Sequence, residues 1–196
     1  MNLEELKEQI KKTEEEIKSL PSFKKWYNFI YNSKIENKKF SLEAKLSDLI
    51  KEKEEAEALE KIKNEAIDYL NNIQNIETDI SASLSKNEYC LMIIDNVEWF
   101  EIRKEQRSEG WKKLYQGILY FTNERLILKT DNETKNIKID TIIDVEIWKD
   151  GVELSKIKGK NILLGNMEIV DVYKTTYFIN TARKGGITIN NKTIGE

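Results

Sequence analysis

Glycine is confined to one end of the chain, and this segregation constrains the fold more than any other feature. All 8 glycines of the 196 residues lie at or beyond Gly110, whereas residues 1–83 hold one proline, 14 basic and 18 acidic side chains. Glycine serves tight turns and proline interrupts helices, so a long segment nearly lacking both favours helices. We therefore predict a helical region over residues 1–83 and a turn-rich domain over residues 84–196, with a serine-rich boundary at residues 81–85.

The helical region carries narrow apolar stripes in strongly charged surroundings. Hydrophobic residues recur every three to four positions over residues 3–20, which predicts one helix that ends before Pro21. Aromatic residues in segment 23–31 are candidates for a core, and Ser41 is the expected N-cap of a second helix that reaches Ile73. Helices with such thin apolar faces are not stable alone. We therefore predict a helical hairpin or coiled coil, packed within the chain or against another copy.

The second region alternates short apolar runs with turn signals, which predicts a small antiparallel barrel or sandwich. The pair Asp150-Gly151 predicts a hairpin with a type I′ turn, whose two central residues need positive φ. Apolar spacing over residues 169–177 predicts a closing helix, so the fold class is α+β. The expected strands are residues 89–94, 99–102, 117–122, 125–130, 136–140, 142–148, 151–157 and 160–164.

Three segments of this region read GILYFTNERLIL (residues 117–128), NIKIDTIIDV (136–145) and DGVEL (150–154). Together they resemble bacterial PH-like (GRAM-like) domains, and the resemblance covers about residues 86–183. It implies a seven-stranded, strongly bent antiparallel barrel with a C-terminal helix, whose members bind lipids, peptides or other proteins. The helical region resembles no family beyond coiled-coil-like helices.

The turn inside the first of these segments has residues suited to hold it. Thr122 and Asn123 can form hydrogen bonds with their own backbone in the turn. Arg125 can bridge neighbouring strands or pair with a carboxylate.

Basic residues gather where phosphoinositide-binding members of that family use the first hairpin loop. The corresponding loop here holds five cations and a tryptophan, but Glu101, Glu105 and Glu109 lie among them and weaken the positive field. It can bind an anionic headgroup or an acidic partner, or it can be a solvated loop with the tryptophan folded back on the barrel. The candidate binding residues are Arg103, Lys104, Arg107, Trp111, Lys112 and Lys113.

We expect no catalytic, cofactor-binding or metal-ligating residues. The chain has no histidine and one cysteine, which excludes histidine-based triads, Cys₄ zinc sites and disulfide scaffolds. Cys90 lies in an apolar run and is expected to be a small buried hydrophobe. Trp99, Phe100 and Trp148 are expected in the barrel core.

Charge and hydropathy set further limits. The formal net charge of −3 argues against a nucleic-acid partner bound through overall basicity. No apolar run approaches the roughly 18–20 residues of a membrane span, and the charged first 20 residues are unlike a secretory signal. We expect a cytoplasmic protein.

The sequence thus favours a non-enzymatic interaction module, in which the helices bind a protein partner or another copy and the PH-like domain offers a second surface. One alternative is a peripheral protein that binds anionic lipid at the inner membrane face through Arg103–Lys113. Another is a phage or mobile-element protein that modulates a host machine by surface contact. The latter rests on composition: 73 of 196 residues are Ile, Asn or Lys and only 4 are Arg, a bias typical of low-GC bacteria and their phages.

Overall fold

The computed structural model describes residues 2–21, 29–105 and 108–184. It divides the chain into two compact units, Met1–Lys61 and Ile62–Glu196, which we call the helical unit and the sheet unit. The division falls inside the long helix α2 (Phe29–Asn71), so the end of that helix belongs to the sheet unit. The serines of the predicted domain boundary also lie in the sheet unit, Ser81 and Ser83 in the short 3₁₀ helix η1 (Ser81–Ser83) and Ser85 just after it.

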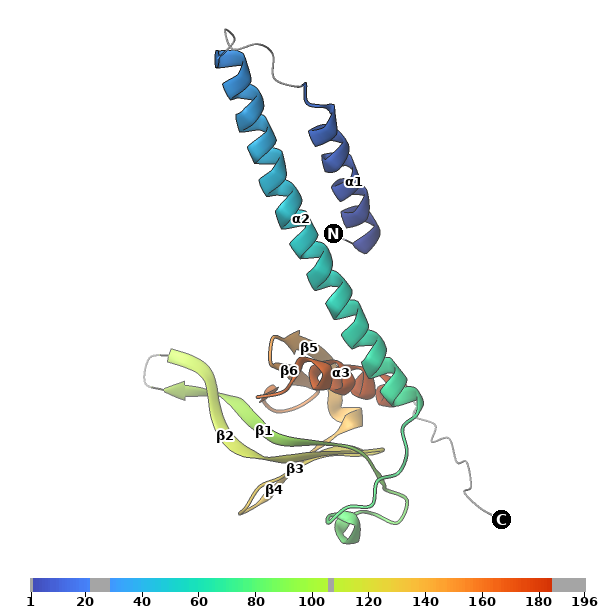
Figure 1. Cartoon of the computed structure of the whole chain (residues 1–196). Coiled ribbons are helices and arrows are strands. Elements are labelled where there is room, and N and C mark those ends of the chain that lie inside the picture. Colours follow the sequence, from blue (N-terminus) through green and yellow to red (C-terminus); the bar gives the residue numbers. More distant parts are fainter. Residues whose placement is uncertain (1, 22–28, 106–107, 185–196) are drawn as a thin grey trace, which may run out of the picture. The chain divides into compact units, whose positions relative to one another are not determined.

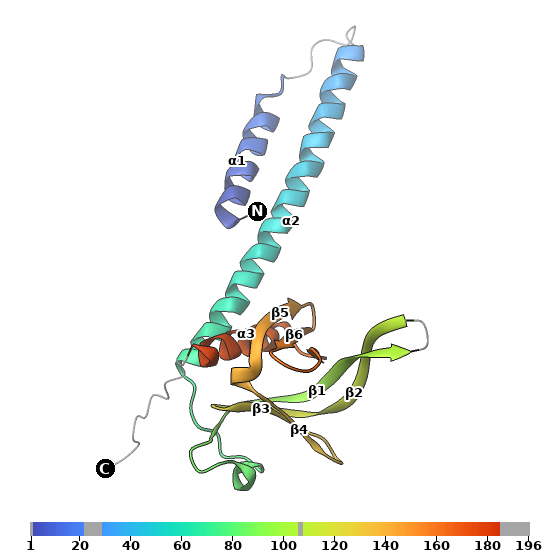
Figure 2. The same ribbon diagram turned by 180° about the vertical axis from the view of Figure 1, so that it is seen from behind.

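The helical unit is the expected pair of helices. Helix α1 (Leu3–Ser19) lies antiparallel beside the first part of α2 in both views (Figures 1 and 2). Its start is fixed by a capping box: the Asn2 side chain accepts a hydrogen bond from the Glu5 amide at 2.9 Å, and the Glu5 carboxylate accepts one from the Asn2 amide at 3.1 Å. The α1 stripe buries Leu6 completely.

The predicted start of the second helix at Ser41 is wrong, because α2 runs unbroken through this position from Phe29. No glycine or proline interrupts residues 29–71, and a serine favours a helix start without forcing one. A Lys39–Glu43 ion pair at 3.7 Å, one helical turn long, spans the predicted cap. The core role expected of segment 23–31 remains a prediction, since residues 22–28 lie outside the described residues.

The sheet unit contains one seven-stranded antiparallel sheet with the order β4-β3-β2-β1-β7-β6-β5, followed by helix α3 (Ile169–Arg183). This is the α+β, PH-like architecture that the sequence predicted. Strands β4 and β5 stand at the two ends of the order, so within the described ranges each has a strand neighbour on one side only. The strands are β1 (Cys90–Glu105), β2 (Ser108–Thr122), β3 (Arg125–Lys129), β4 (Thr134–Lys138), β5 (Ile142–Trp148), β6 (Gly151–Lys156) and β7 (Ile162–Gly165), with the 3₁₀ helix η2 (Ile139–Thr141) before β5.

The strands expected at residues 89–94 and 99–102 form the single strand β1, whose pairing with β2 is irregular between them. The register with β2 shifts between Ile94 and Val97, and Asn96 adopts a left-handed conformation with φ of 58°. Asparagine tolerates this region better than most residues. The chain therefore bends at Asp95–Asn96 without leaving the sheet.

The segment Arg103–Lys113, expected as a loop, consists mainly of the outer parts of β1 and β2. Their pairing continues to Glu105 and Ser108, with Glu101 opposite Lys112. Opposite charges at facing positions stabilise an antiparallel pair, which explains why so charged a segment remains in strands.

The core lies between the sheet and α3. Phe121 and Phe178 meet edge to face with ring centroids 5.3 Å apart. Cys90 and Trp99 are buried as predicted. The core position expected for Trp148 is wrong, since 39% of this residue is exposed.

The β5–β6 hairpin forms where Asp150-Gly151 predicted it, but the type I′ turn is wrong. Trp148 pairs with Gly151, so the two loop residues are Lys149 and Asp150, and neither has a positive φ. Glycine is needed at position 151 because the neighbouring backbone comes close: a Cβ atom there would lie 2.2 Å from the Leu164 carbonyl oxygen.

Candidate functional site

The predicted basic site is distributed along the β1–β2 hairpin, and two of its cations are ion-paired with neighbouring acids. The Arg103 guanidinium lies 2.8 Å from the Glu101 carboxylate, and the Lys113 ammonium lies 2.5 Å from that of Glu98. Both charges are therefore largely neutralised within the hairpin. Lys112 is exposed on β2, whereas the side chain of Lys104 and all of Arg107 lie outside the described residues.

Trp111, the aromatic residue of the predicted site, folds back against the sheet unit. It lies on β2 opposite Ile102, and its ring meets that of Trp148 edge to face, with centroids 6.3 Å apart and an interplanar angle of 85°. This contact joins the hairpin to β5 and places two tryptophans together at the surface.

Exposed apolar side chains are concentrated on the edge strand β5. Ile143 is 52% exposed, Ile147 42% and Trp148 39%, although the strand has only seven residues. Isolated exposed hydrophobic residues are ordinary, whereas several on one strand mark a surface for interaction. We call Ile143, Ile147, Trp148 and Trp111 the β5 patch.

The register with β6 shows that the β5 patch extends over both faces of the strand. Ile147 pairs with the buried Val152 and so points to the core side of the sheet. Trp148 pairs with Gly151 and points to the opposite face. A molecule that covered only one face would leave one of the two uncovered.

Two carboxylates lie between these apolar residues. Asp144 and Glu146 are exposed and share the face of Trp148, since side chains alternate along a strand. Across residues 2–21, 29–105 and 108–184, neither carboxylate has an ion-pair partner. The β5 patch therefore combines apolar contacts with two available negative charges.

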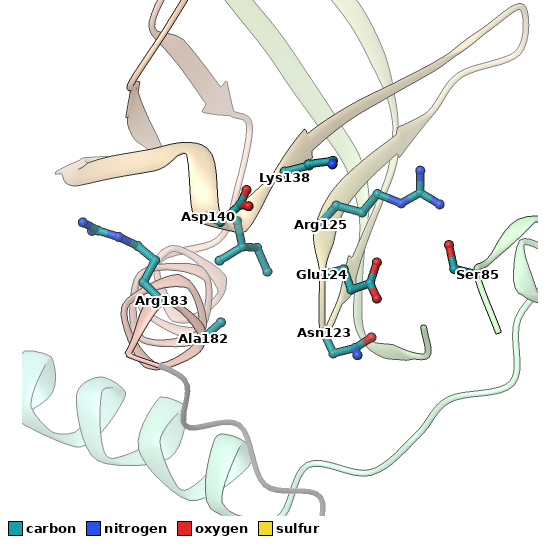
Figure 3. A pocket seen from close by; sticks show the side chains of 9 residues that line it. Ser85, Asn123, Glu124, Arg125, Lys138, Asp140, Ala182 and Arg183 are labelled. Carbon is teal, nitrogen blue, oxygen red and sulfur yellow. The ribbon is translucent and has the colours of Figure 1, made fainter. Parts of the chain in front are cut away.

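A pocket of about 450 Å³ opens elsewhere on the sheet unit, between the β2–β3 turn, η2 and the end of α3 (Figure 3). Its walls carry charges of both signs, among them Glu124, Lys138 and Asp140. Arg183 at its rim donates a hydrogen bond to the Ile143 carbonyl oxygen. The pocket has both polar and apolar walls, and its arginine side chains are held in contacts with the rest of the sheet unit.

Arg125 of this pocket forms a two-point ion pair with Glu88, which is the pairing with a carboxylate that was one of its two predicted roles. Its Nε and Nη2 atoms donate to the two carboxylate oxygens at 2.8 and 2.9 Å. Burial of the Glu88 carboxyl opposes its ionisation, but hydrogen bonds from Arg125, the Ser85 amide and Thr122 outweigh burial and lower its pKa. The pair fixes the turn to the segment before β1.

The predicted Thr122 turn bonds are present, and Asn123 acts differently. The Thr122 hydroxyl accepts hydrogen bonds from the amides of Glu124 and Arg125 at 3.2 and 2.9 Å. The Asn123 side chain instead bonds the backbone of residues 87 and 89. These contacts are structural.

Ile143 and Ile147 were not predicted as binding residues, although the sequence of their strand holds a signal for them. The β5 sequence IIDVEIW has apolar residues at odd and even positions, whereas a strand with one wet face alternates. Such a strand is either buried on both faces or exposes apolar residues. The position of β5 at the end of the sheet, which the sequence does not encode locally, decides for exposure.

Within the part of the chain that the structure describes, no three cysteine, aspartate or glutamate side chains gather closely enough to hold a metal ion. Nor does any helix there combine the length and hydropathy that crossing a bilayer requires.

Comparisons with known proteins give structural similarity only. No protein-family model and no curated protein matches the sequence. The crystal structure of Dcp1p is 14% identical in sequence, and the match covers 61% of this chain and 93% of that chain with a TM-score of 0.39. The N-terminal PH domain of human ARAP2 is 11% identical, and the match covers 53% of this chain and 86% of that chain with a TM-score of 0.34. The linker-DH/PH domains of p115-RhoGEF are 10% identical, and the match covers 93% of this chain and 55% of that chain with a TM-score of 0.37. The PH-like assignment rests on the chain's own strand order and C-terminal helix.

Proposed function

We propose that the chain is a non-enzymatic interaction module that binds a protein partner through the β5 patch. The observation that supports this most is the exposure of Ile143, Ile147 and Trp148 on a single edge strand. Tryptophan is the residue most enriched at the energetic centres of protein interfaces. Burying this group in an interface removes apolar surface from water, at about 25 cal/mol per Å² before the costs of association.

The helical unit offers a second surface, and we propose that it self-associates. Phe40 is 75% exposed and Ile50 is also exposed on α2, in a part of the helix rich in charged residues. The α1–α2 hairpin is thin, because α1 contributes only Leu6 and Thr13 as buried residues among those described. A second copy packed on the pair would cover apolar surface that the hairpin leaves half-exposed.

Binding to an anionic membrane through the β1–β2 hairpin is the rival function. The ion pairs of Arg103 and Lys113 with acids of the same hairpin count against it, since two of its described cations already have a partner. Sedimentation with liposomes that contain or lack anionic lipid tests it. Binding that depends on anionic lipid and is lost in the Lys112→Glu, Lys113→Glu double variant would favour the membrane over the β5 patch.

Affinity co-purification with matched surface variants tests the proposal. We expect a partner that co-purifies with the wild-type chain to be lost with Ile147→Asp and with Trp148→Ala. The control is Ile157→Asp, because Ile157 is 62% exposed in the same unit but lies outside β5. Equal recovery by all three variants would contradict a role for the β5 patch.

A further inference from the structure

We infer that the β5 patch binds an extended, basic segment of a partner protein, which joins the sheet as a further strand beside β5. This inference rests on the proposed function and specifies how the partner is bound. Three features of one edge strand support it. Among the described residues, one side of the β5 backbone has no strand partner and the carboxylates of Asp144 and Glu146 have no ion-pair partner, and apolar side chains lie on both faces of the strand.

The backbone of β5 is available for pairing along most of its length. The strand ends the sheet order, so on one side its amides and carbonyls have no strand partner among the described residues. The carbonyl of Ile143 is the exception, since Arg183 donates a hydrogen bond to it. An added strand therefore has residues 144–148 to pair with, which is enough for an ordinary short strand.

The distribution of apolar residues fits a strand better than a globular surface. Ile147 and Trp148 are neighbours in sequence and point to opposite faces of the sheet. A strand placed beside β5 also has side chains on both faces, so it reaches both residues at once. This two-sided contact follows from strand geometry alone.

The two carboxylates decide the chemistry of the partner and disfavour a second copy of β5. Asp144 and Glu146 lie on either side of Val145 in the sequence and share the face opposite to it. Cross-strand neighbours of opposite charge stabilise pairing. Antiparallel self-pairing centred on Val145 would instead set Asp144 of one copy opposite Glu146 of the other. Like charges at facing positions are destabilising, so a lysine- or arginine-containing segment is the better occupant.

The other edge of the sheet shows what a protected edge looks like in the same chain. Strand β4 reads TKNIK, buries Ile137, and exposes Thr134, Asn136 and Lys138. Polar residues and lysine on an edge strand prevent unwanted pairing. The β5 edge lacks a lysine and exposes isoleucine and tryptophan instead, so only one of the two edges is suited to accept a strand.

A synthetic peptide tests the inference directly. The probe is a capped heptapeptide in which lysine alternates with valine, titrated into the isotope-labelled full chain at low salt and followed by amide NMR shifts. We expect the largest shifts at residues 144–148. The Asp144→Lys, Glu146→Lys double variant should bind about tenfold more weakly, because two favourable cross-strand pairs become repulsive. A glutamate–valine peptide should bind that variant better than it binds the wild type.

Matched controls separate strand addition from ordinary side-chain contact. The Asp95→Lys, Asp131→Lys double variant carries the same change of charge on exposed positions away from β5 and should bind as the wild type does. Two peptides N-methylated at alternate backbone positions should differ strongly, because only one set of amides faces the edge of β5. Equal binding of the two N-methylated peptides would overturn strand addition.

The remaining outcomes distinguish this inference from the proposed function. If the natural partner is lost with Trp148→Ala but is indifferent to the Asp144→Lys, Glu146→Lys change, the β5 patch binds proteins and the basic-strand inference is wrong. If the peptide has no effect and Trp148→Ala instead separates a dimer of the chain, the occupant is a second copy. If Trp148→Ala disturbs neither the binding of a partner nor a dimer of the chain, both the proposed function and the basic-strand inference are contradicted.

Discussion

The Glu88 carboxylate links single-residue chemistry to the stability of the sheet unit. Its side chain is fully buried, Arg125 binds both of its oxygens, and Thr122 donates a further hydrogen bond at 2.8 Å. Removing Arg125 would leave a buried charge without its counter-ion. The motif residue Arg125 therefore acts in folding.

Replacing Glu88 by glutamine should change how stability depends on pH. The folded-state pKa of Glu88 lies below its ordinary value, so its ionised form contributes stability above the unfolded pKa of about 4.3. That contribution is lost as pH falls through the folded pKa. We expect the free energies of unfolding of wild type and Glu88→Gln, measured by urea denaturation, to differ near neutral pH and to converge in acid. A constant difference would contradict the assignment, and the exposed Glu124→Gln is the control.

Gly117 and Gly110 form a matched pair on the same strand, β2. A Cβ atom at Gly117 would lie 2.0 Å from the Lys129 carbonyl oxygen, whereas one at Gly110 would meet nothing within 4 Å. We expect Gly117→Ala to lower the free energy of unfolding by about 1–3 kcal/mol through overpacking. Gly110→Ala should be neutral or slightly stabilising. Equal effects in thermal or urea denaturation would show that β2 and β3 are not this close.

At the scale of whole elements, the α1–α2 pair depends on few buried side chains. Leu6 is completely buried, and Leu49 on α2 is 6% exposed. The Leu6→Ala variant should cost about 2–5 kcal/mol of local packing and increase amide exchange over residues 3–19. Exchange within β1, β2 and β3 should not change, because these strands belong to the other compact unit. Increased exchange throughout the chain would contradict independent opening of α1.

The existence of the elements was largely readable from the sequence, because each depends on a local period. Strand β3 forms where Leu126 and Leu128 predicted a strand, although Ile127 between them is buried as well, and α3 appears where apolar spacing predicted a helix. Exact limits were not readable at Ser41, where a favourable cap did not begin a helix. Nor was the continuation of β1 through Asn96, which depends on one left-handed residue.

The candidate site was less predictable, because it depends on what lies beside each strand. The basic residues of the β1–β2 hairpin were visible as a cluster, but their pairing with Glu98 and Glu101 depends on register. The exposure of Trp148 follows from its strand being last in the sheet order. Sheet order arises from contacts distant in sequence, which a local pattern does not record.

At the scale of the molecule, each unit has one proposed binding surface. For the helical unit we expect a mass above the 23.1 kDa of one chain by light scattering at concentrations of tens of micromolar. The mass should fall toward that of one chain with Phe40→Lys and Ile50→Lys together, because a charge on each exposed apolar position opposes burial. Ile157→Lys in the sheet unit is the control. A monomer at all concentrations would leave α1 and α2 as an intramolecular hairpin only.

Photo-crosslinking from β5 would show whether a partner protein contacts this strand in the cell. A photoreactive phenylalanine analogue in place of Ile147 should give a discrete adduct with a partner protein when the chain is irradiated in its native cells. The same analogue in place of the more exposed Ile157 should give none. The Ile147 adduct should also disappear when Asp144 and Glu146 are replaced by lysine. Absence of an adduct at position 147, or the same adduct from both positions, would contradict binding through the β5 patch.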